Sequence, residues 1–305
     1  MLEVLVQMTG LIVCGIAWRV FKPAGLEPAQ TRKVLTSLVY YLLLPALVLS
    51  VLWKAELGNT TLLIALSAAF AVAVGMGLSV LSCRACRSSP PVAGAVILAA
   101  TFPNATYLGL PVLEAAFGPW ARGVAIQYDL FACTPLLFTL GILVASRYGN
   151  TTERARNMAA ELLRIPALLA AVLAVFLNIM EVPSHAVLDG LLGLLERGVV
   201  PLMLFSLGLS LEWNRAHWQT LPSVIPVVLL RLFIVPAIIL PFASVIGLTG
   251  EWKAAVVLET AMPSMVLGIV FCDRYNLDVS IYAAAVTITT VLSLLTLPMW
   301  YQVLV

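Results

Sequence analysis

Long apolar stretches separated by short polar connections fill the chain from end to end. Each stretch is about 20 residues long, enough for an α-helix to cross a hydrocarbon core about 30 Å thick. Charged and turn residues, such as Lys22-Pro23, bound the stretches. The pattern predicts ten membrane-spanning helices, at residues 2–20, 31–53, 60–83, 91–117, 120–146, 160–180, 187–211, 220–247, 252–272 and 277–303.

Most basic residues fall in the connections after the odd-numbered spans. These connections hold 12 of the 17 lysines and arginines: Arg19, Lys22, Arg32, Lys33, Arg84, Arg87, Arg147, Arg154, Arg156, Arg164, Arg215 and Arg274. Basic loops stay on the cytoplasmic side of a membrane. We therefore expect a multi-pass protein of the plasma membrane (the inner membrane in bacteria), with both termini on the non-cytoplasmic side.

Similar proline motifs occur at corresponding places in the two halves of the chain. Leu44–Leu47 (LPAL) in the second span matches Val200–Met203 (VPLM) in the seventh. Ala100–Asn104 (ATFPN) in the fourth span matches Thr260–Ser264 (TAMPS) in the ninth, and a Leu-Gly pair follows each. Five spans per half is an odd number, so the halves would have opposite orientations. Inverted repeats with interrupted helices indicate a secondary transporter.

The division between the repeats is predicted in the longest connection, Arg147–Arg164. Residues 1–150 would form the first inverted repeat, with helices 1–5. Residues 151–305 would form the second, with helices 6–10.

The fourth and ninth spans are predicted to be broken. Two prolines and a glycine within residues 101–111 disfavour a continuous helix, and the freed backbone groups must face protein or water. Asn104 and Ser264 directly follow Pro103 and Pro263 and are residue types suited to capping a second half-helix. The positive N-terminal ends of two half-helices would attract a carboxylate. The alternative is that the two prolines only kink packed helices.

Three ionisable residues lie inside predicted spans, where they are costly and often functional. Asp129 and Glu259 are candidates for carrying a coupling proton or sodium ion. Arg231 could pair with one of them or meet an anionic substrate. The alternative for each is a structural ion pair between helices.

Composition and motifs exclude several other classes. The chain is 62% hydrophobic and 10% charged, which fits a membrane protein and not a soluble domain. The sequence has no HExxH or GxSxG motif and no glycine-rich phosphate loop, so neither an enzyme nor an ATP-driven pump is expected. The five cysteines lack the spacing of a metal site, and the dispersed basic residues give no reason to expect a nucleic-acid partner.

At these residues the chain resembles the auxin efflux carrier family, which includes plant auxin carriers and bacterial malonate and malate permeases. The resemblance covers nearly the whole chain. It rests on these segments: Tyr41–Leu47, Asn104–Pro111, Phe117-Gly118, Ala261–Ser264, Asp273–Tyr275 and Leu294–Pro298. The chain lacks the long central loop of the plant members, and Ser264 stands where many relatives have Asn.

The resemblance implies an all-α membrane fold of ten transmembrane helices, arranged as two five-helix inverted repeats as in sodium–bile acid symporters. Helices 1, 2, 6 and 7 would form a scaffold that dimerises, and helices 3–5 and 8–10 a moving transport domain. The crossover of helices 4 and 9 would bind the substrate. Residues that would contribute to this site are Pro103, Asn104, Tyr107, Gly109, Gln127, Pro263 and Ser264.

We therefore expect a carrier for small organic anions, namely mono- or dicarboxylates such as malonate or malate, working by elevator-type alternating access. No cofactor is expected beyond a possible coupling H⁺ or Na⁺. The expected partners are the anion, the lipid bilayer and a second copy of the chain. Two alternatives stay open: a cation-coupled symporter or antiporter of the same fold for another substrate, and a membrane sensor that does not translocate its ligand.

Overall fold

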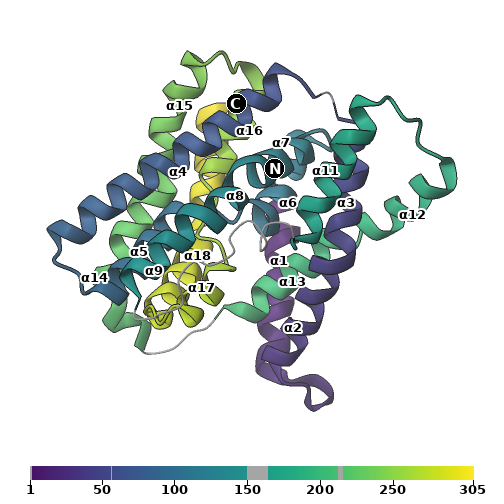
Figure 1. Ribbon diagram of the computed structural model, residues 1–305. Coiled ribbons are helices and arrows are strands. Elements are labelled where there is room, and N and C mark those ends of the chain that lie inside the picture. The colour runs from purple at the N-terminus through teal and green to yellow at the C-terminus, as the bar shows by residue number, and fades with distance from the viewer. Residues whose placement is uncertain (1, 56, 150–163, 212–215) are drawn as a thin grey trace.

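The computed structural model describes residues 2–55, 57–149, 164–211 and 216–305. All regular elements in these ranges are helical, and the only β-type pairing among them is one isolated bridge between Pro103 and Ser264. Figure 1 shows helices of different lengths packed side by side. The predicted all-helical class is confirmed for the described ranges.

The helices of the first half run from the N-terminus to residue 148. They are α1 (Leu2–Phe21), α2 (Pro28–Leu38), α3 (Leu44–Trp53), α4 (Asn59–Ala85), α5 (Pro90–Thr101), α6 (Leu110–Phe117), α7 (Ala121–Tyr128), α8 (Thr134–Leu136) and α9 (Ile142–Tyr148). Short π-helical turns continue the helices at Val39–Leu43, Ala105–Gly109, Asp129–Cys133 and Leu137–Gly141.

The helices of the second half begin at residue 166 and run to residue 304. They are α11 (Pro166–Ile179), α12 (Ala186–Glu196), α13 (Val199–Ser210), α14 (Ala216–Leu229), α15 (Val235–Val245), α16 (Gly250–Thr260), α17 (Gly268–Arg274) and α18 (Val279–Leu304). A π-helical turn, Leu230–Ile234, joins α14 to α15. Most of the predicted joint between the halves lies outside the described residues, together with Arg154, Arg156 and Arg215.

Six helical stretches of the described chain are long and apolar enough to cross a membrane. They are Pro28–Trp53, Asn59–Ala85, Ala121–Tyr148, Ala186–Ser210, Leu221–Val245 and Val279–Leu304. Shorter apolar helices cover Val6–Phe21, Pro90–Thr101, Ala105–Phe117 and Pro166–Ile179. Ten complete crossings and the inverted repeat stay predictions.

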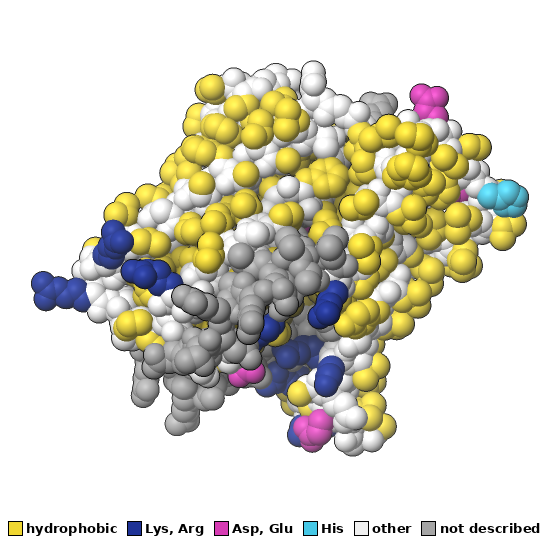
Figure 2. Space-filling view, in the orientation of Figure 1, with side chains coloured by type: hydrophobic (Ala, Val, Ile, Leu, Met, Phe, Trp, Pro, Cys, Tyr) yellow, Lys and Arg dark blue, Asp and Glu magenta, His cyan; other side chains and the backbone are white. Residues whose placement is uncertain are grey.

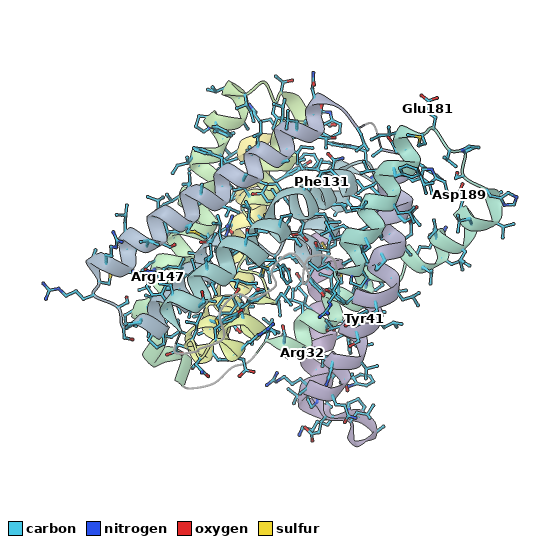
Figure 3. The ribbon with its side chains drawn as sticks, in the orientation of Figure 1. Arg32, Tyr41, Phe131, Arg147, Glu181 and Asp189 are labelled. Atoms are coloured by element: carbon cyan, nitrogen blue, oxygen red, sulfur yellow. The ribbon has the colours of Figure 1, made fainter. Side chains whose placement is uncertain are left out.

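The surface is suited to lipid. Figure 2 shows hydrophobic side chains over much of the visible described surface, with lysine and arginine gathered at the left edge and the lower centre. Figure 3 places Arg147 at the left and Arg32 at the lower centre, with Glu181 and Asp189 at the upper right. We call the end with Arg32 and Arg147 the basic end. An apolar belt between two polar ends is the arrangement a bilayer requires.

The helices pack into two groups. In the first, α1 packs on α13, and α3 packs on α11 and α12. In the second, α4 packs on α5 and α15, while α18 packs on α14 and α5. Figure 1 shows the first group at the right and the second at the left.

The first group is held together by a close crossing of α1 and α13. A Cβ atom on Gly15 would lie 2.2 Å from the carbonyl oxygen of Phe205, and one on Gly208 would lie 2.1 Å from that of Ile12. Both distances are shorter than any normal van der Waals contact. Small residues let membrane helices approach until their backbones touch, which favours association by dispersion.

The substitution Gly208→Ala should therefore push α1 and α13 apart. We expect it to lower the free energy of unfolding by about 1–3 kcal/mol, the usual cost of overpacking. Thermal unfolding of the purified protein in detergent would measure the change. Gly10→Ala is the matched control, because Gly10 has nothing within 4 Å of its position for a Cβ atom. Equal destabilisation by both variants would contradict the close crossing.

Candidate functional site

The first break in a helix (residues 102–104) separates α5 from the turn that leads into α6. Phe102 is extended, with φ −101° and ψ 118°, and Pro103 has no amide hydrogen with which to continue the helix. The carbonyl of Asn104 then accepts bonds from the amides of Leu108 and Gly109, at 3.2 and 3.0 Å. Asn104 thus starts the next half-helix through its backbone, while its side chain makes no capping bond.

The second break (residues 261–267) separates α16 from α17. We expected Ser264 to cap the following half-helix, and this was wrong, because α17 begins only at Gly268. The Ser264 hydroxyl donates instead to the carbonyl of Ala99 at 2.8 Å, and the Ser264 amide donates to Thr289 Oγ1 at 3.1 Å. The serine hydroxyl thus replaces the amide donor that the carbonyl of Ala99 lacks because residue 103 is proline.

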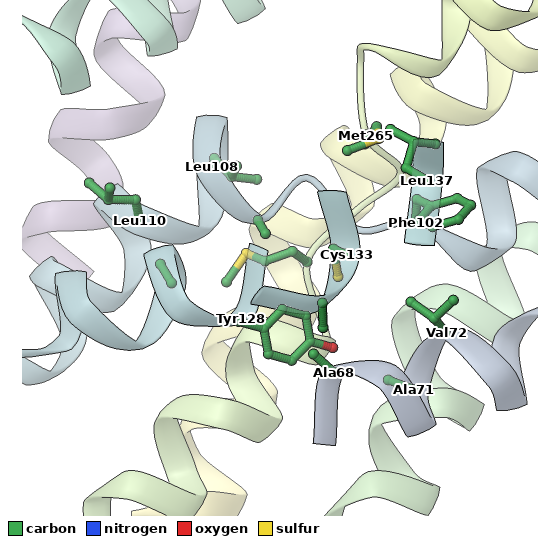
Figure 4. Packing of buried hydrophobic residues seen from close by; sticks show 14 of the residues in the cluster. Ala68, Ala71, Val72, Phe102, Leu108, Leu110, Tyr128, Cys133, Leu137 and Met265 are labelled. Atoms are coloured by element: carbon green, nitrogen blue, oxygen red, sulfur yellow. The ribbon is translucent and has the colours of Figure 1, made fainter. Parts of the chain in front are cut away.

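The two breaks pair with each other. The amide of Asn104 donates to the carbonyl of Pro263 at 2.8 Å, and the amide of Met265 donates to the carbonyl of Phe102 at 3.1 Å. Tyr282 adds a hydroxyl bond to the carbonyl of Met265 at 2.8 Å. We call this unit the paired breaks. Figure 4 shows the buried apolar side chains around it, including Phe102 and Met265.

Arg231 joins the ends of both interrupted helices. It lies in the turn between α14 and α15 and is 0% exposed. Its Nη1 donates to the carbonyl of Thr101 at 2.9 Å and to that of Ala100 at 3.4 Å, and its Nη2 donates to the carbonyl of Thr260. One guanidinium therefore neutralises the negative C-terminal ends of α5 and α16.

Arg231 makes no ion pair with Asp129 or Glu259 among the described residues. Its observed partners are backbone carbonyls. They are buried at the apolar centre of the molecule, where an unsatisfied carbonyl is costly.

Replacing Arg231 with Met should leave carbonyls of two helix ends without donors. We expect Arg231→Met to reduce the free energy of unfolding by about 3 kcal/mol or more, the scale of lost charged hydrogen bonds in a buried site. Thermal unfolding in detergent would test this. The exposed Arg84 supplies the control, since Arg84→Met should cost less than about 1 kcal/mol. Stability unchanged by Arg231→Met would refute the bridging role.

Asp129 lies at the start of a π-helical turn after α7 and is 7% exposed. One carboxylate oxygen accepts a bond from Thr134 Oγ1 at 2.9 Å, and the other accepts a bond from Thr106 Oγ1. Both oxygens therefore have partners, and the carboxylate connects this helix to the half-helix that follows Asn104. Thr106 lies within the motif we singled out, yet its role was missed. Nothing in the local sequence marked Thr134.

Glu259 is the opposite case. It is 0% exposed in the last turn of α16, and neither of its carboxylate oxygens has a hydrogen-bond partner. A Cβ atom on Gly109 would lie 2.2 Å from Glu259 Oε1, so the carboxylate packs directly on the backbone after the first break. Glycine is required at position 109 for this approach. Gly268 plays a similar part, because the ring of Tyr282 passes over it.

Two cavities meet at the paired breaks. The inner cavity, of about 70 Å³, is lined by Tyr40, Leu44, Asn104, Ala105, Thr106, Tyr107, Asp129, Leu130, Thr134, Phe138, Ile165, Ala167, Met265, Val266 and Leu267. The outer cavity, of about 340 Å³, lies towards the basic end and is lined by Ala29, Arg32, Lys33, Thr36, Ser37, Tyr107, Ser206, Leu207, Ser210, Val266, Leu267, Ile269 and Val270. Tyr107, Val266 and Leu267 belong to both walls.

The structure brings most of the predicted site residues together. Asn104 is 1% exposed, lines the inner cavity, and its Nδ2 amide has no hydrogen-bond partner. Pro103, Pro263 and Ser264 belong to the backbone pairing behind it. Gln127 is buried in α7 with an unpartnered Oε1, but it lines neither the inner nor the outer cavity.

Comparison with known proteins gives one family and several relatives. A family model described as "Membrane transport protein" matches residues 4–301. An uncharacterized transporter of Methanothermobacter thermautotrophicus is 28% identical over 99% of this chain and 98% of its own length. One from Methanocaldococcus jannaschii is 25% identical over 99% and 98%. The uncharacterized transporter YfdV of Escherichia coli is 22% identical over 68% of this chain and 66% of its own.

Proposed function

The chain belongs to the membrane transport protein family, the auxin efflux carriers, and from that premise we propose that it is a secondary transporter for small organic anions. Its substrates would be mono- or dicarboxylates such as malonate or malate. It would move them by elevator-type alternating access, with Asn104 contacting the carboxylate.

The observation that carries the proposal is the free amide of Asn104 beside the start of a half-helix. Its Nδ2 is a buried donor without a partner, on a residue that lines the inner cavity. The first amides of the turn Ala105–Gly109 have no acceptor within their own helix. These donors together suit a carboxylate and need no formal positive charge. Tyr107 adds a hydroxyl-bearing side chain to the same wall.

Movement is supported by the division of the helices into two groups. The paired breaks belong to the second group, with α4–α6 and α16–α18, while α1–α3 and α11–α13 form the first. The outer cavity lies between the groups. So does a third cavity of about 390 Å³, which is lined by Leu47 and Val200 on one side and by Pro111 and Glu114 on the other. In the proposed mechanism the first group is the scaffold and the second is the transport domain. The ten helices then form two inverted repeats, residues 1–150 and 151–305.

The proposed setting is the plasma membrane, with the basic end in the cytoplasm and both termini on the opposite side. The scaffold helices would join two copies of the chain in a homodimer. Apolar side chains such as Val172, Phe176 and Leu194 are exposed on this group and provide surface for lipid or for a second copy.

Removal of the Asn104 amide should abolish transport. We expect Asn104→Ala in proteoliposomes to lower saturable uptake of labelled malonate or malate by about a hundredfold or more, because a buried donor and the substrate's orientation are lost together. The matched control is Asn59→Ala, at an exposed position at the start of α4. Uptake should be measured at equal protein density with proton, sodium and potential gradients imposed in turn.

Uptake that survives in Asn104→Ala would place the site elsewhere. If the folded parent protein bound these acids without moving them, the protein would be a sensor. Absence of both binding and uptake would remove carboxylates from consideration.

Coupling to an ion is assigned in this proposal to Glu259. A buried carboxylate with no hydrogen-bond partner calls for a proton or a cation to compensate it, whereas the Asp129 carboxylate already accepts two hydroxyl bonds. Because Glu259 packs on Gly109, its occupancy would act directly on the half-helix that follows Asn104.

The substitution Glu259→Gln should therefore separate transport from its driving ion. We expect uptake by this variant to lose most of its dependence on the imposed proton or sodium gradient, while substrate exchange persists. Asp129→Asn is the comparison, and it should retain the gradient dependence while raising the KM through loss of one of the two hydroxyl bonds that Asp129 accepts. The opposite assignment would follow if Asp129→Asn, and not Glu259→Gln, removed the gradient dependence.

A further inference from the structure

The outer cavity contains two basic residues that belong to the first helix group. Arg32 and Lys33 line it from α2, together with the hydroxyl residues Thr36 and Ser37. Ser206 and Ser210 of α13 face the same space. Its opposite wall, from Val266 to Val270, is apolar apart from the backbone and belongs to the second break and α17. The polar lining is thus concentrated on one side of the cavity.

Neither Arg32 nor Lys33 forms an ion pair or a side-chain hydrogen bond within the described ranges. Three other cations of the described chain have carboxylate partners. Lys22 pairs with Glu27 at 3.0 Å, Lys54 with Asp189 at 2.9 Å, and Arg122 with both Glu114 and Glu196. Arg32 is half-buried, and the described wall of this cavity contains no acidic residue. Two uncompensated cations beside four hydroxyls favour an anion in the cavity.

The outer cavity adjoins the inner one. Tyr107, Val266 and Leu267 line both. Helix α2 and the π-helical turn that continues it also line both cavities, with Arg32 in the wall of the outer cavity and Tyr40 in that of the inner one. The eight residues between Arg32 and Tyr40 correspond to about 12 Å along the helix axis, and the long side chain of Arg32 can cover part of that length. A small molecule with its carboxylate at Asn104 therefore has the shared residues on its outer side, and Arg32 lines the cavity beyond them.

We propose that Arg32 and Lys33 form a second anion subsite, which selects substrates with two negative charges over those with one. This inference rests on the proposed function, in which Asn104 holds the first carboxylate. The second carboxylate is bound by the two cations, with the hydroxyls of Thr36 and Ser206 beside them. A monocarboxylate leaves both cations without a counter-ion and gains nothing from them.

The subsite also has a consequence for the transport cycle. Asn104 belongs to the helix group of the paired breaks, whereas Arg32 and Lys33 belong to the other group. Movement of one group past the other separates the two subsites. The second carboxylate is therefore held only in the state that is open to the basic end, and its release accompanies the movement.

The test compares two acids of equal chain length, succinate and butyrate, on the full chain in neutral phosphatidylcholine vesicles. The variants are Arg32→Gln and the control Arg84→Gln, which changes an exposed arginine outside the outer cavity. We expect Arg32→Gln to raise the KM for succinate about tenfold and to change that for butyrate less than about twofold, whereas Arg84→Gln changes neither. Thermal stabilisation of the detergent-solubilised protein by each acid gives the same comparison without transport. Adding anionic lipid shows whether headgroups compete for the cations.

Equal effects of Arg32→Gln on both acids, or none on succinate, would overturn the subsite. So would a succinate effect that vanishes at high ionic strength, since that is the behaviour of general surface charge. If Asn104→Ala still abolished uptake in either case, the carrier assignment would stand and only the subsite would fail. If the parent protein neither bound nor moved either acid, both the subsite and the carboxylate assignment would be wrong.

Discussion

The arrangement of this protein depends on one requirement: a backbone that leaves its helix in an apolar interior must find other hydrogen-bond partners. Pro103 and Pro263 each end a helix at the centre of the molecule, and each break would be costly by itself. The breaks satisfy one another through two backbone bonds, and Arg231 binds carbonyls at the ends of both α5 and α16. Neither break is therefore stable in this form without the other. These bonds join the two interrupted helices into one unit, which the proposed movement of a bound molecule would require.

The same requirement shows where the functional groups are. Around the paired breaks, the amides of Phe102, Asn104 and Met265 have acceptors, and the carbonyls of these residues and of Pro263 have donors. By contrast, the side-chain amide of Asn104 and the carboxylate of Glu259 have no hydrogen-bond partner. Buried polar groups without partners are rare in native proteins and call for an explanation. A ligand at the Asn104 amide and an ion at the Glu259 carboxylate would provide one. Their closeness through the Gly109 backbone would allow the occupancy of one to affect the other.

The sequence predicted the helices well, because apolar length and proline position are local properties. The end of α5 at Thr101 and of α16 at Thr260 follow directly from the prolines two and three residues later. The partners of Arg231 could not be predicted, since a buried arginine is as compatible with a carboxylate as with backbone carbonyls. Two of these carbonyls belong to α5, more than a hundred residues away along the chain. Ser264 was misassigned for a related reason. Its residue type favours a cap, but a carbonyl of α5 competed for the hydroxyl and bound it.

The role of Arg32 could be inferred only from its surroundings in the structure. In the sequence Arg32 is one more basic residue in a connection, and basic connections need no function beyond orienting the chain. In the structure it faces a cavity without a counter-ion and lies on the group that does not contain the paired breaks. In the proposed mechanism, a charge on the transport domain would travel with the substrate and bind it equally on both sides. A charge on the proposed scaffold would bind it on one side only. The helix that carries the arginine would then decide on which side a doubly charged substrate is held more tightly.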